Sequence, residues 1–181
     1  MPGGGYWDLR PGQVTDDSEL AMCLLRGLVA GKGKLDLFHH ALYYGYWVHY
    51  EPFDIGVTTW NGLGPLCECL QNPDPGLAQS AARFNKGEGS LSNGSLMRIT
   101  PLAVWARNLS TSELEQVVVA DVSFTHSKKD MWDIVSCYCL AIQVLLKNPE
   151  DPNRVQLALE AVREYANRFY TSNLLKEWLF P

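Results

Sequence analysis

Three neighbouring side chains near the start of the chain carry oxygen atoms that could bind a metal ion. They are Thr15, Asp16 and Asp17, in the stretch PGQVTDDSEL at residues 11–20. An acidic residue at a helix start is stabilised by the helix dipole by about 0.3–1 kcal/mol, and a threonine there commonly caps the helix. Two adjacent carboxylates, however, repel each other unless a cation lies between them. The triplet is therefore either a helix cap or part of a magnesium site.

A second group of candidates lies in a glycine-rich stretch, GEGSLSNGSLMR, at residues 87–98. Its glycines permit positive φ angles and a close approach of the backbone to a ligand. If Asn93, Gly94 and Ser95 stand at a helix start, free N–H groups would point outward and suit a phosphate or diphosphate. The stretch matches neither the Walker nor the dinucleotide pattern. The alternative is a flexible turn in which Ser95 caps the next helix.

A third candidate is His126, which stands between two hydroxyl residues in the stretch FTHSKKD. The flanking patterns place it at a junction between two helices. It either contacts a ligand or is a junction residue with satisfied hydrogen bonds. Phe84 and Trp60, in or beside loops, could stack on an adenine ring, or they could belong to the core.

Helices must position these residues, because apolar residues recur at helical spacing along most of the chain. Alternating runs typical of strands are scarce. The pattern predicts an all-α protein with one compact domain over residues 1–181. The expected helices lie at residues 17–29, within 34–50, in the second part of 54–72, from about 95 to 104 with a bend or restart at Pro101, at 112–124, at 128–147 and from 154 to the end.

The same periodicity predicts which helix faces are buried and where one helix is capped. Ser112 and Glu115 have the spacing of a capping box. The predicted inner faces are Leu20, Leu24 and Leu28 for the first helix; Leu35, Phe38, Leu42 and Tyr46 for the second; and Val155, Leu159, Val162 and Ala166 for the last.

Composition excludes several classes of function. The 181 residues are 46% hydrophobic and carry a net charge of −5, so no basic surface is expected to bind nucleic acid or an anionic membrane. No apolar run approaches the roughly 20 residues of a membrane helix, and no secretion signal is recognised, so a cytoplasmic location is expected. The five cysteines are odd in number, and their Cys-x-Cys pairs lie in predicted helices, which favours buried thiols over zinc ligands.

Four stretches, taken together and in this order, resemble the ADP-ribosylglycohydrolase family, which includes the dinitrogenase-reductase-activating glycohydrolases. The stretches are PGQVTDDSELAMCL, PFDIGVTTWNGL, SNGSLMRITPLAV and THSKKDMWDIVSCYCLAI. The resemblance implies an all-α fold with two Mg²⁺ ions in a cleft. The metals position the distal ribose of ADP-ribose, and a water there, assisted by a carboxylate, cleaves the bond to an acceptor such as a protein side chain.

The resemblance also assigns roles by position. It implies that Thr15, Asp16 and Asp17 are metal ligands, with the catalytic role resting on Asp16 and Asp17. Residues 93–95, named above, would line the diphosphate–ribose pocket. His126 would contact the bound nucleotide, and Phe84 would lie on the adenine side.

Two elements of the family pattern are missing from the sequence. The family begins with a helix bearing Gly-Asp and a downstream Glu at the metal site, and it ends with an Asp-x-Asp-Thr segment that supplies further ligands. Neither is found here, so the domain is expected to be incomplete at both ends. At most one weak Mg²⁺ site is expected, because about three protein oxygens serve an ion that prefers six ligands. Apolar faces left uncovered would favour an oligomer.

The sequence is compatible with two functions. The first is a Mg²⁺-dependent hydrolase that releases ADP-ribose from a protein side chain or a small molecule. The second is a derivative that binds ADP-ribose, or serves a structural role, without hydrolysis, because half of the metal site is absent. The sequence does not distinguish arginine, serine or O-acetyl-ADP-ribose as the substrate class.

Overall fold

The fold is all-α in the computed structural model, which describes residues 3–74, 76, 89–168 and 173–180. Within these residues no strand forms, and a single β-bridge joins Gly4 to Leu9. No helix among them is both long and apolar enough to cross a membrane. The helices are α1 (Asp16–Ala30), α2 (Leu37–His49), α3 (Val57–Leu63), α4 (Glu68–Gln71), α6 (Thr100–Trp105), α7 (Thr111–Val122), α8 (Lys129–Lys147), α9 (Arg154–Arg168) and α10 (Asn173–Leu179), with 3₁₀ turns η1 (Gly64–Cys67) and η2 (Ala106–Asn108).

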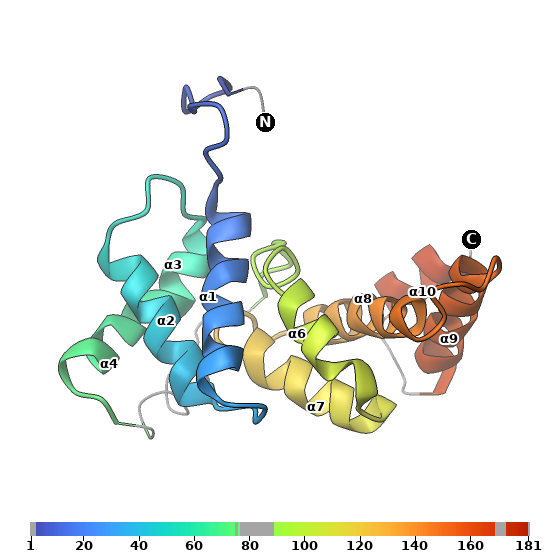
Figure 1. Cartoon of the computed structure of the whole chain (residues 1–181). Coiled ribbons are helices and arrows are strands. Elements are labelled where there is room, and N and C mark those ends of the chain that lie inside the picture. The colour runs from blue at the N-terminus through green and yellow to red at the C-terminus, as the bar shows by residue number, and fades with distance from the viewer. Residues whose placement is uncertain (1–2, 75, 77–88, 169–172, 181) are drawn as a thin grey trace.

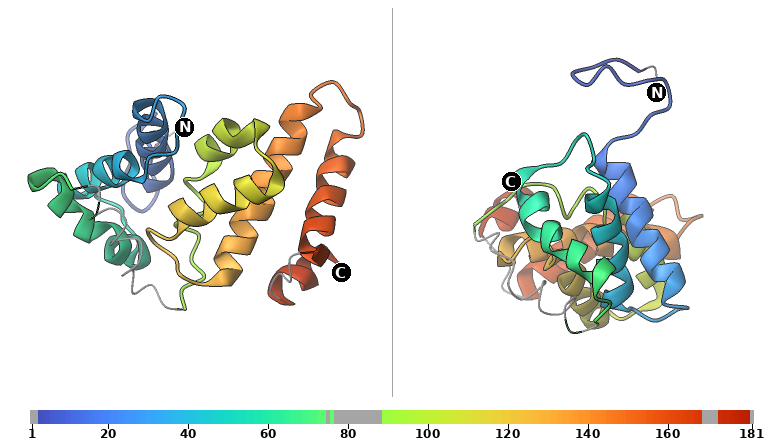
Figure 2. Two further views of the ribbon diagram at one scale, coloured as in Figure 1. Left: turned by 90° about the horizontal axis from the view of Figure 1, so that it is seen from below. Right: turned by 90° about the vertical axis from the view of Figure 1, so that its left-hand side faces the viewer.

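The helices succeed one another across the molecule in chain order (Figure 1). Helices α1 to α4 form one end, α6 to α8 the middle, and α9 and α10 the other end, and the segment before α1 projects away from the bundle. Figure 2 shows α7 and α8 lying alongside each other, with α9 beyond α8. One continuous hydrophobic core runs through the bundle, from Leu20 and Leu24 of α1 to Val162 of α9.

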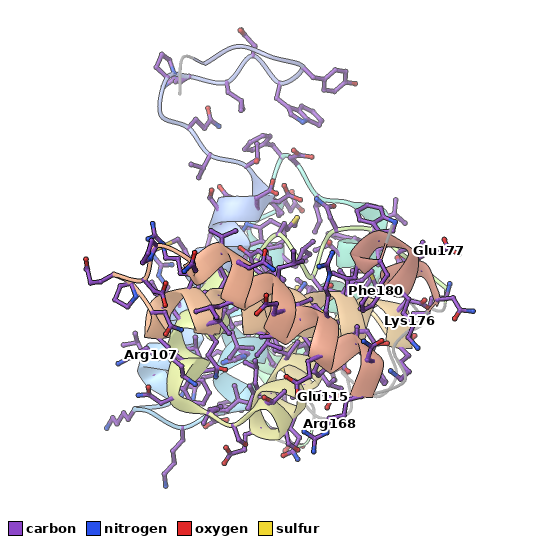
Figure 3. All side chains as sticks on the ribbon, turned by 90° about the vertical axis from the view of Figure 1, so that its right-hand side faces the viewer. Arg107, Glu115, Arg168, Lys176, Glu177 and Phe180 are labelled. Carbon is purple, nitrogen blue, oxygen red and sulfur yellow. The ribbon has the colours of Figure 1, made fainter. Side chains whose placement is uncertain are left out.

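The last residues fold back onto α9. The Arg163 side chain donates from Nε to the Leu179 carbonyl at 2.9 Å, and its guanidinium lies 5.8 Å from the ring centre of Phe180. Figure 3 shows Phe180 at this end of the molecule, with Arg168 lower on the same side. These contacts fix α10 against α9, away from the residues discussed below.

The structure confirms the predicted inner face of α1 but corrects that of α2. In α2 the buried residues include Ala41, Tyr44 and Val48, whereas Tyr46 is half exposed. The prediction considered only large apolar side chains, whereas the contact between α2 and η1 is made by Gly45. A Cβ built at Gly45 would lie 2.4 Å from the Leu66 carbonyl oxygen, so the backbone of α2 packs directly against η1.

Two further predictions were wrong in register. The capping box of α7 is formed by Ser110 and Glu113, because the helix begins at Thr111 and the Ser-x-x-Glu spacing occurs twice in succession. In α9 the buried face begins one turn later than predicted. Its buried residues are Ala158, Val162, Tyr165 and Ala166, while Val155 is 70% exposed, since the small Ala158 is where α9 first packs closely on the bundle.

The cysteines behave as the sequence indicated. All five are free thiols, and four of them are buried. Cys67 is half-buried, and its Sγ donates to the Gly45 carbonyl at 3.6 Å. Burial raises the pKa of Cys23 to about 11. The thiols therefore serve as small apolar packing groups.

Candidate functional site

The acidic triplet begins α1, but Thr15 does not cap the helix with its side chain. Thr15 occupies the N-cap position with an extended backbone, and its hydroxyl makes no capping bond. Instead Thr15 Oγ1 donates to Asp17 Oδ2 at 3.2 Å, and Asp16 Oδ1 accepts from the Asp17 backbone N–H at 3.0 Å. The Thr15 side chain therefore does not cap α1, and the role of the triplet as metal ligands stays a prediction.

A fourth residue, Asp54, joins this acidic cluster from the loop between α2 and α3. The pKa of Asp16 is raised from 3.8 to about 6, first by partial burial and then by the charges of Asp54 and Asp17. Sequence reasoning did not select Asp54, although it lies in the stretch PFDIGVTTWNGL. The crowding of three carboxylates raises the cost of ionising Asp16, and a bound cation would lower that cost.

The donors in this cluster match magnesium in type but not in number. Hydroxyl and carboxylate oxygens are the ligands that Mg²⁺ prefers, with water completing six positions. Over the part of the chain that the structure describes, no three Asp, Glu, His or Cys side chains converge closely enough to enclose a metal ion. Thr15, Asp16 and Asp17 therefore offer oxygen donors of the right type but, among the described residues, not enough of them to enclose the ion.

A second polar cluster lies a short distance along the chain from Asp54. Thr58, in the first turn of α3, hydrogen-bonds through Oγ1 to Ser90 Oγ at 2.8 Å, and Ser90 in turn donates to Ser92 at 3.2 Å. Ser92 Oγ lies 3.1 Å from Nε2 of His126. Asp54 and Thr58 are four residues apart, so their Cα atoms lie within about 14 Å of each other.

Gly94 lies beside His126, but the predicted binding residues 93–95 do not start a helix. Residues 93–98 form a turn, and α6 begins only at Thr100, so the expected helix N-terminus for a phosphate is not present. Asn93 is exposed, and a Cβ at buried Gly94 would lie 2.6 Å from Thr59 Oγ1 and 3.6 Å from the His126 ring. Ser95 is fully buried, and its hydroxyl has no partner among the described residues, so it does not cap a helix.

A fully buried ion pair holds this turn in place. The Arg98 guanidinium lies 3.2 Å from a carboxylate oxygen of Asp121, and both side chains are completely buried. Asp121 also accepts from the Tyr44 hydroxyl at 3.0 Å and from His40 Nδ1 at 3.1 Å. Burial alone would raise the pKa of Asp121, but Arg98, His40 and Tyr44 together hold it below its ordinary value. The carboxylate is therefore ionised and fully paired.

Arg98 connects the ion pair to the candidate binding residues. Its NH1 group donates to the Gly94 carbonyl at 2.7 Å and to Thr125 Oγ1 at 2.9 Å. Thr125 Oγ1 lies 2.9 Å from Nδ1 of His126. Neither member of the ion pair was predicted from the sequence, although each is a charged residue inside an apolar run, LMRIT for Arg98 and VVVADV for Asp121. A charge in such a position is itself a signal of a buried partner.

His126 is a buried junction residue and also a neighbour of the exposed serines. Its pKa is lowered from 6.5 to about 4, chiefly by burial and next by the charge of Arg98. Trp132 of α8 donates from its indole N–H to the His126 carbonyl at 3.0 Å. The imidazole is therefore neutral at physiological pH and hydrogen-bonded at the junction, and its contact with a ligand stays a prediction.

Of the two aromatic candidates for an adenine ring, the structure describes only Trp60, and it lines a different hollow. Trp60 is 49% exposed on α3, where it lines a separate hollow of about 540 Å³ together with His49 and Pro65. Phe84 lies outside the described residues, so its predicted role stays a prediction.

Gly62 sets the distance between α3 and the residues that precede His126. A Cβ at Gly62 would lie 2.3 Å from the Phe124 carbonyl oxygen and 2.8 Å from the Thr125 Cα, and neither backbone atom can move alone. We expect Gly62→Ala to lower the free energy of unfolding by about 1–3 kcal/mol, as overpacking does elsewhere. Urea denaturation followed by tryptophan fluorescence measures this loss. Gly64→Ala is the control, because nothing lies within 4 Å of its Cβ; equal losses for both variants would contradict the prediction.

Comparison with known proteins supplies the identification. The family model described as ADP-ribosylglycohydrolase matches residues 1–179. This chain belongs to the ADP-ribosylglycohydrolase family. The motif resemblance found in the sequence is thereby confirmed.

Individual relatives give the same assignment. A protein of Acanthamoeba polyphaga mimivirus named as an ADP-ribosyl glycohydrolase is 29% identical over 94% of this chain and 50% of its own length. The ADP-ribosyl-[dinitrogen reductase] glycohydrolase of Rhodospirillum rubrum is 32% identical over 70% of this chain and 39% of its own. The ADP-ribosylarginine hydrolase Tri1 of Pseudomonas putida is 34% identical over 81% of this chain and 38% of its own. The chain thus spans half or less of each relative's length.

Proposed function

We propose that this chain carries ADP-ribose-binding and metal-binding residues of a glycohydrolase that cleaves the bond between ADP-ribose and an acceptor. The observation that carries the proposal is the half-buried Asp16 at the start of α1, whose pKa is raised to about 6 first by burial and then by the charges of Asp54 and Asp17. Buried carboxylates with a structural role are normally paired with a positively charged group. A group of carboxylates that has no such partner is typical of a functional site.

Thr15, Asp16 and Asp17 are the residues that would hold magnesium. A bound Mg²⁺ would supply positive charge that offsets the carboxylates and attracts the ribose hydroxyls. Residues 93–95 and His126 would bind the diphosphate–ribose part, since the turn and the ring lie together. The donors in this chain support one weak site rather than the two metals implied by the family resemblance.

Asp16 suits a role in proton transfer. In the hydrolysis, a water oxygen forms a bond to the anomeric carbon of the ribose while the bond from that carbon to the acceptor breaks. The water loses one proton, and the leaving acceptor atom gains one. In the metal-free chain the pKa of Asp16 is about 6, so a carboxyl oxygen of Asp16 that is not bound to Mg²⁺ can accept and return a proton near neutral pH. Asp17 would hold its partner Thr15 in place.

An arginine side chain is the acceptor we propose first. The names of two relatives, ADP-ribosylarginine hydrolase and ADP-ribosyl-[dinitrogen reductase] glycohydrolase, indicate modified proteins as their substrates. Beside the acidic triplet, a groove of about 640 Å³ is lined by Val14 and Ser18 and by residues such as Tyr50 and Glu51. A guanidinium group binds well to an aromatic face next to a carboxylate.

The second candidate function is ADP-ribose binding without hydrolysis. It is favoured by the incomplete enclosure of a metal among the described residues. Such a protein would keep the 93–95 turn and His126 for binding and would gain nothing from magnesium.

Calorimetry with ADP-ribose, with and without Mg²⁺, combined with an assay of ADP-ribose release from ADP-ribosylarginine, tests both functions. For the hydrolase we expect binding that Mg²⁺ strengthens and release of free ADP-ribose. Glu51→Gln should slow release from ADP-ribosylarginine while leaving ADP-ribose binding unchanged. Binding without release, unaffected by a chelator, would favour the second function, and no binding at millimolar ADP-ribose would contradict both.

A further inference from the structure

Glu51 lines two hollows on the surface of the bundle. The first is the groove of about 640 Å³ proposed above for the acceptor arginine, and the second is the hollow of about 540 Å³ beside α3. Glu51 belongs to both sets of lining residues, and no other described residue does. Two hollows that adjoin at one carboxylate can hold two side chains of the same polypeptide.

The second hollow combines an aromatic face with acceptors of hydrogen bonds. Trp60 and Asn61 line it from α3, His49 from the end of α2 and Pro65 from η1. Trp60 is 49% exposed, and Asn61 and Glu51 are exposed as well. The side chains of Asn61 and Glu51 make no hydrogen bond or ion pair with another described residue. Both are therefore available to a ligand.

The backbone of Glu51 adopts a conformation in which glycine is the usual residue. Its φ angle is 50°, in the left-handed region, and its N–H donates to the Val48 carbonyl at 3.0 Å directly after the end of α2. Helices that end in this way commonly have glycine there, because a Cβ is disfavoured in this region. A residue kept in such a strained position is typical of a functional site. The carboxylate between the two hollows is therefore a candidate for ligand binding.

The charge of the second hollow selects a cationic ligand. Among the described residues that line it, Glu51 is the only acidic one, and none is Lys or Arg. A phosphate or carboxylate group would therefore be repelled. A guanidinium or ammonium group is attracted to the face of an exposed tryptophan and to a nearby carboxylate. Such a group can also donate a hydrogen bond to an amide oxygen like that of Asn61.

We infer that the hollow lined by Glu51, Trp60 and Asn61 is a second substrate subsite, which binds a lysine or arginine side chain of the modified protein close to its ADP-ribosylated arginine. The inference rests on the proposed function, in which the ADP-ribosylated arginine occupies the adjoining groove. It makes Trp60 a residue that determines specificity. It also favours modified proteins with basic surroundings over small ADP-ribosylated molecules as substrates.

Nuclear magnetic resonance with two unmodified pentapeptides tests the subsite without any hydrolysis. Both peptides have capped ends, a central arginine and glycine on either side of it; the two outer residues are lysine in one peptide and glutamine in the other. Residues two positions apart in an extended chain lie on the same side, about 7 Å apart. Having lysine at both ends tests the two possible directions of binding.

The lysine peptide should shift the indole N–H signal of Trp60 and bind with a Kd about fivefold below that of the glutamine peptide. This is the gain expected from one cation–π contact beside a carboxylate at an exposed site. Equal affinities of the two peptides, or a Trp60 signal that does not shift, would overturn the inference.

Replacements of Trp60 separate its aromatic face from its bulk. Trp60→Phe keeps an aromatic ring and should keep a preference for the lysine peptide, whereas Trp60→Leu keeps only apolar bulk and should bind the two peptides equally. Calorimetry measures the affinities, and circular dichroism verifies that the helices are retained. Trp178→Leu is the control, because Trp178 is 80% exposed on α10, at the opposite end of the molecule from α3 (Figure 1). A fivefold preference that persists in Trp60→Leu would overturn the inference, since the net negative charge of the chain would then account for it.

The same peptides, ADP-ribosylated at the central arginine, separate this inference from the proposed function. In the wild type, KM should be about fivefold lower for the lysine peptide with kcat unchanged, and in Trp60→Leu the two KM values should be equal. Release of ADP-ribose with equal KM values in the wild type would overturn the inference and support the proposed function. A preference for the unmodified lysine peptide without any binding of ADP-ribose would contradict the proposed function and, with it, the role of the hollow as a substrate subsite.

Discussion

Replacing Asp121 by alanine is expected to lower the free energy of unfolding by about 3–5 kcal/mol, the usual cost of leaving one buried charge without its partner. Arg98 would keep its charge at full burial with its carboxylate partner removed, and Tyr44 and His40 would lose an acceptor. Urea denaturation followed by circular dichroism measures the loss. Asp36→Asn is the control, because that carboxylate is paired with His39 at the surface and asparagine can still cap α2.

The pH dependence gives this prediction a second readout. The pKa of Asp121 is lower in the folded chain than in the unfolded chain. Its contribution to stability is therefore complete above the ordinary aspartate pKa of about 4 and is lost as the pH falls through the lower, folded value. The wild type should lose this contribution on acidification, and Asp121→Ala should lack that part of the acid dependence. A loss below 1 kcal/mol would show that the ion pair does not hold the bundle together.

Asp16→Asn is expected to abolish the strengthening of ADP-ribose binding by Mg²⁺ while making the metal-free chain more stable. A carboxylate in a site of few ligands contributes much of the affinity for Mg²⁺, so we expect a loss of at least about tenfold at pH 7. Stability should rise by about 1 kcal/mol, after allowance for solvent screening of a half-buried group. Calorimetry with Mg²⁺ and ADP-ribose, and thermal unfolding of the metal-free chain, measure the two effects.

The sign of the stability change follows from the raised pKa of Asp16. The folded chain holds this proton up to about pH 6, whereas the unfolded chain releases it near the value of 3.8. The wild type therefore loses stability as the pH rises from about 4 to about 6, and the asparagine variant should not. Mg²⁺ competes with the proton, so its effect in the wild type should fade below pH 6. Glu150→Gln removes an exposed charge in the loop between α8 and α9 and should change neither measurement.

If Asp16→Asn is more stable than the wild type and Mg²⁺ no longer strengthens its binding of ADP-ribose, the acidic cluster serves function at a cost in stability. Asp16→Asn without either effect would contradict the metal site. It would leave the triplet as the start of α1 and nothing more.

Much of the fold could be read from local patterns. Leu20, Leu24 and Leu28 recur at helical spacing, and they are buried on α1 as predicted. The predicted bounds of α8 differ from the observed ones by one residue. These features depend on residues a few positions apart, and a helix places such residues on one face whatever the rest of the chain does.

Predictions from the sequence were wrong where helices pack through residues other than large apolar ones. The buried face of α2 depends on Gly45, whose lack of a side chain lets η1 approach. Neither pattern nor composition distinguishes such a glycine from one in a turn. The wrong capping box of α7 has a similar origin, since two Ser-x-x-Glu spacings overlap and only the tertiary packing of the helix selects Ser110.

By itself, the sequence determined the all-α class, the family and the acidic triplet with the 93–95 turn and His126 as candidate site residues, because these are short stretches whose chemistry is local. Only the tertiary structure decided that Asp54 joins the triplet and that Arg98 meets Asp121 across 23 residues. Charged residues that are far apart in the chain interact according to their distance and burial in the folded state. The spacing of residues in the sequence determines neither quantity.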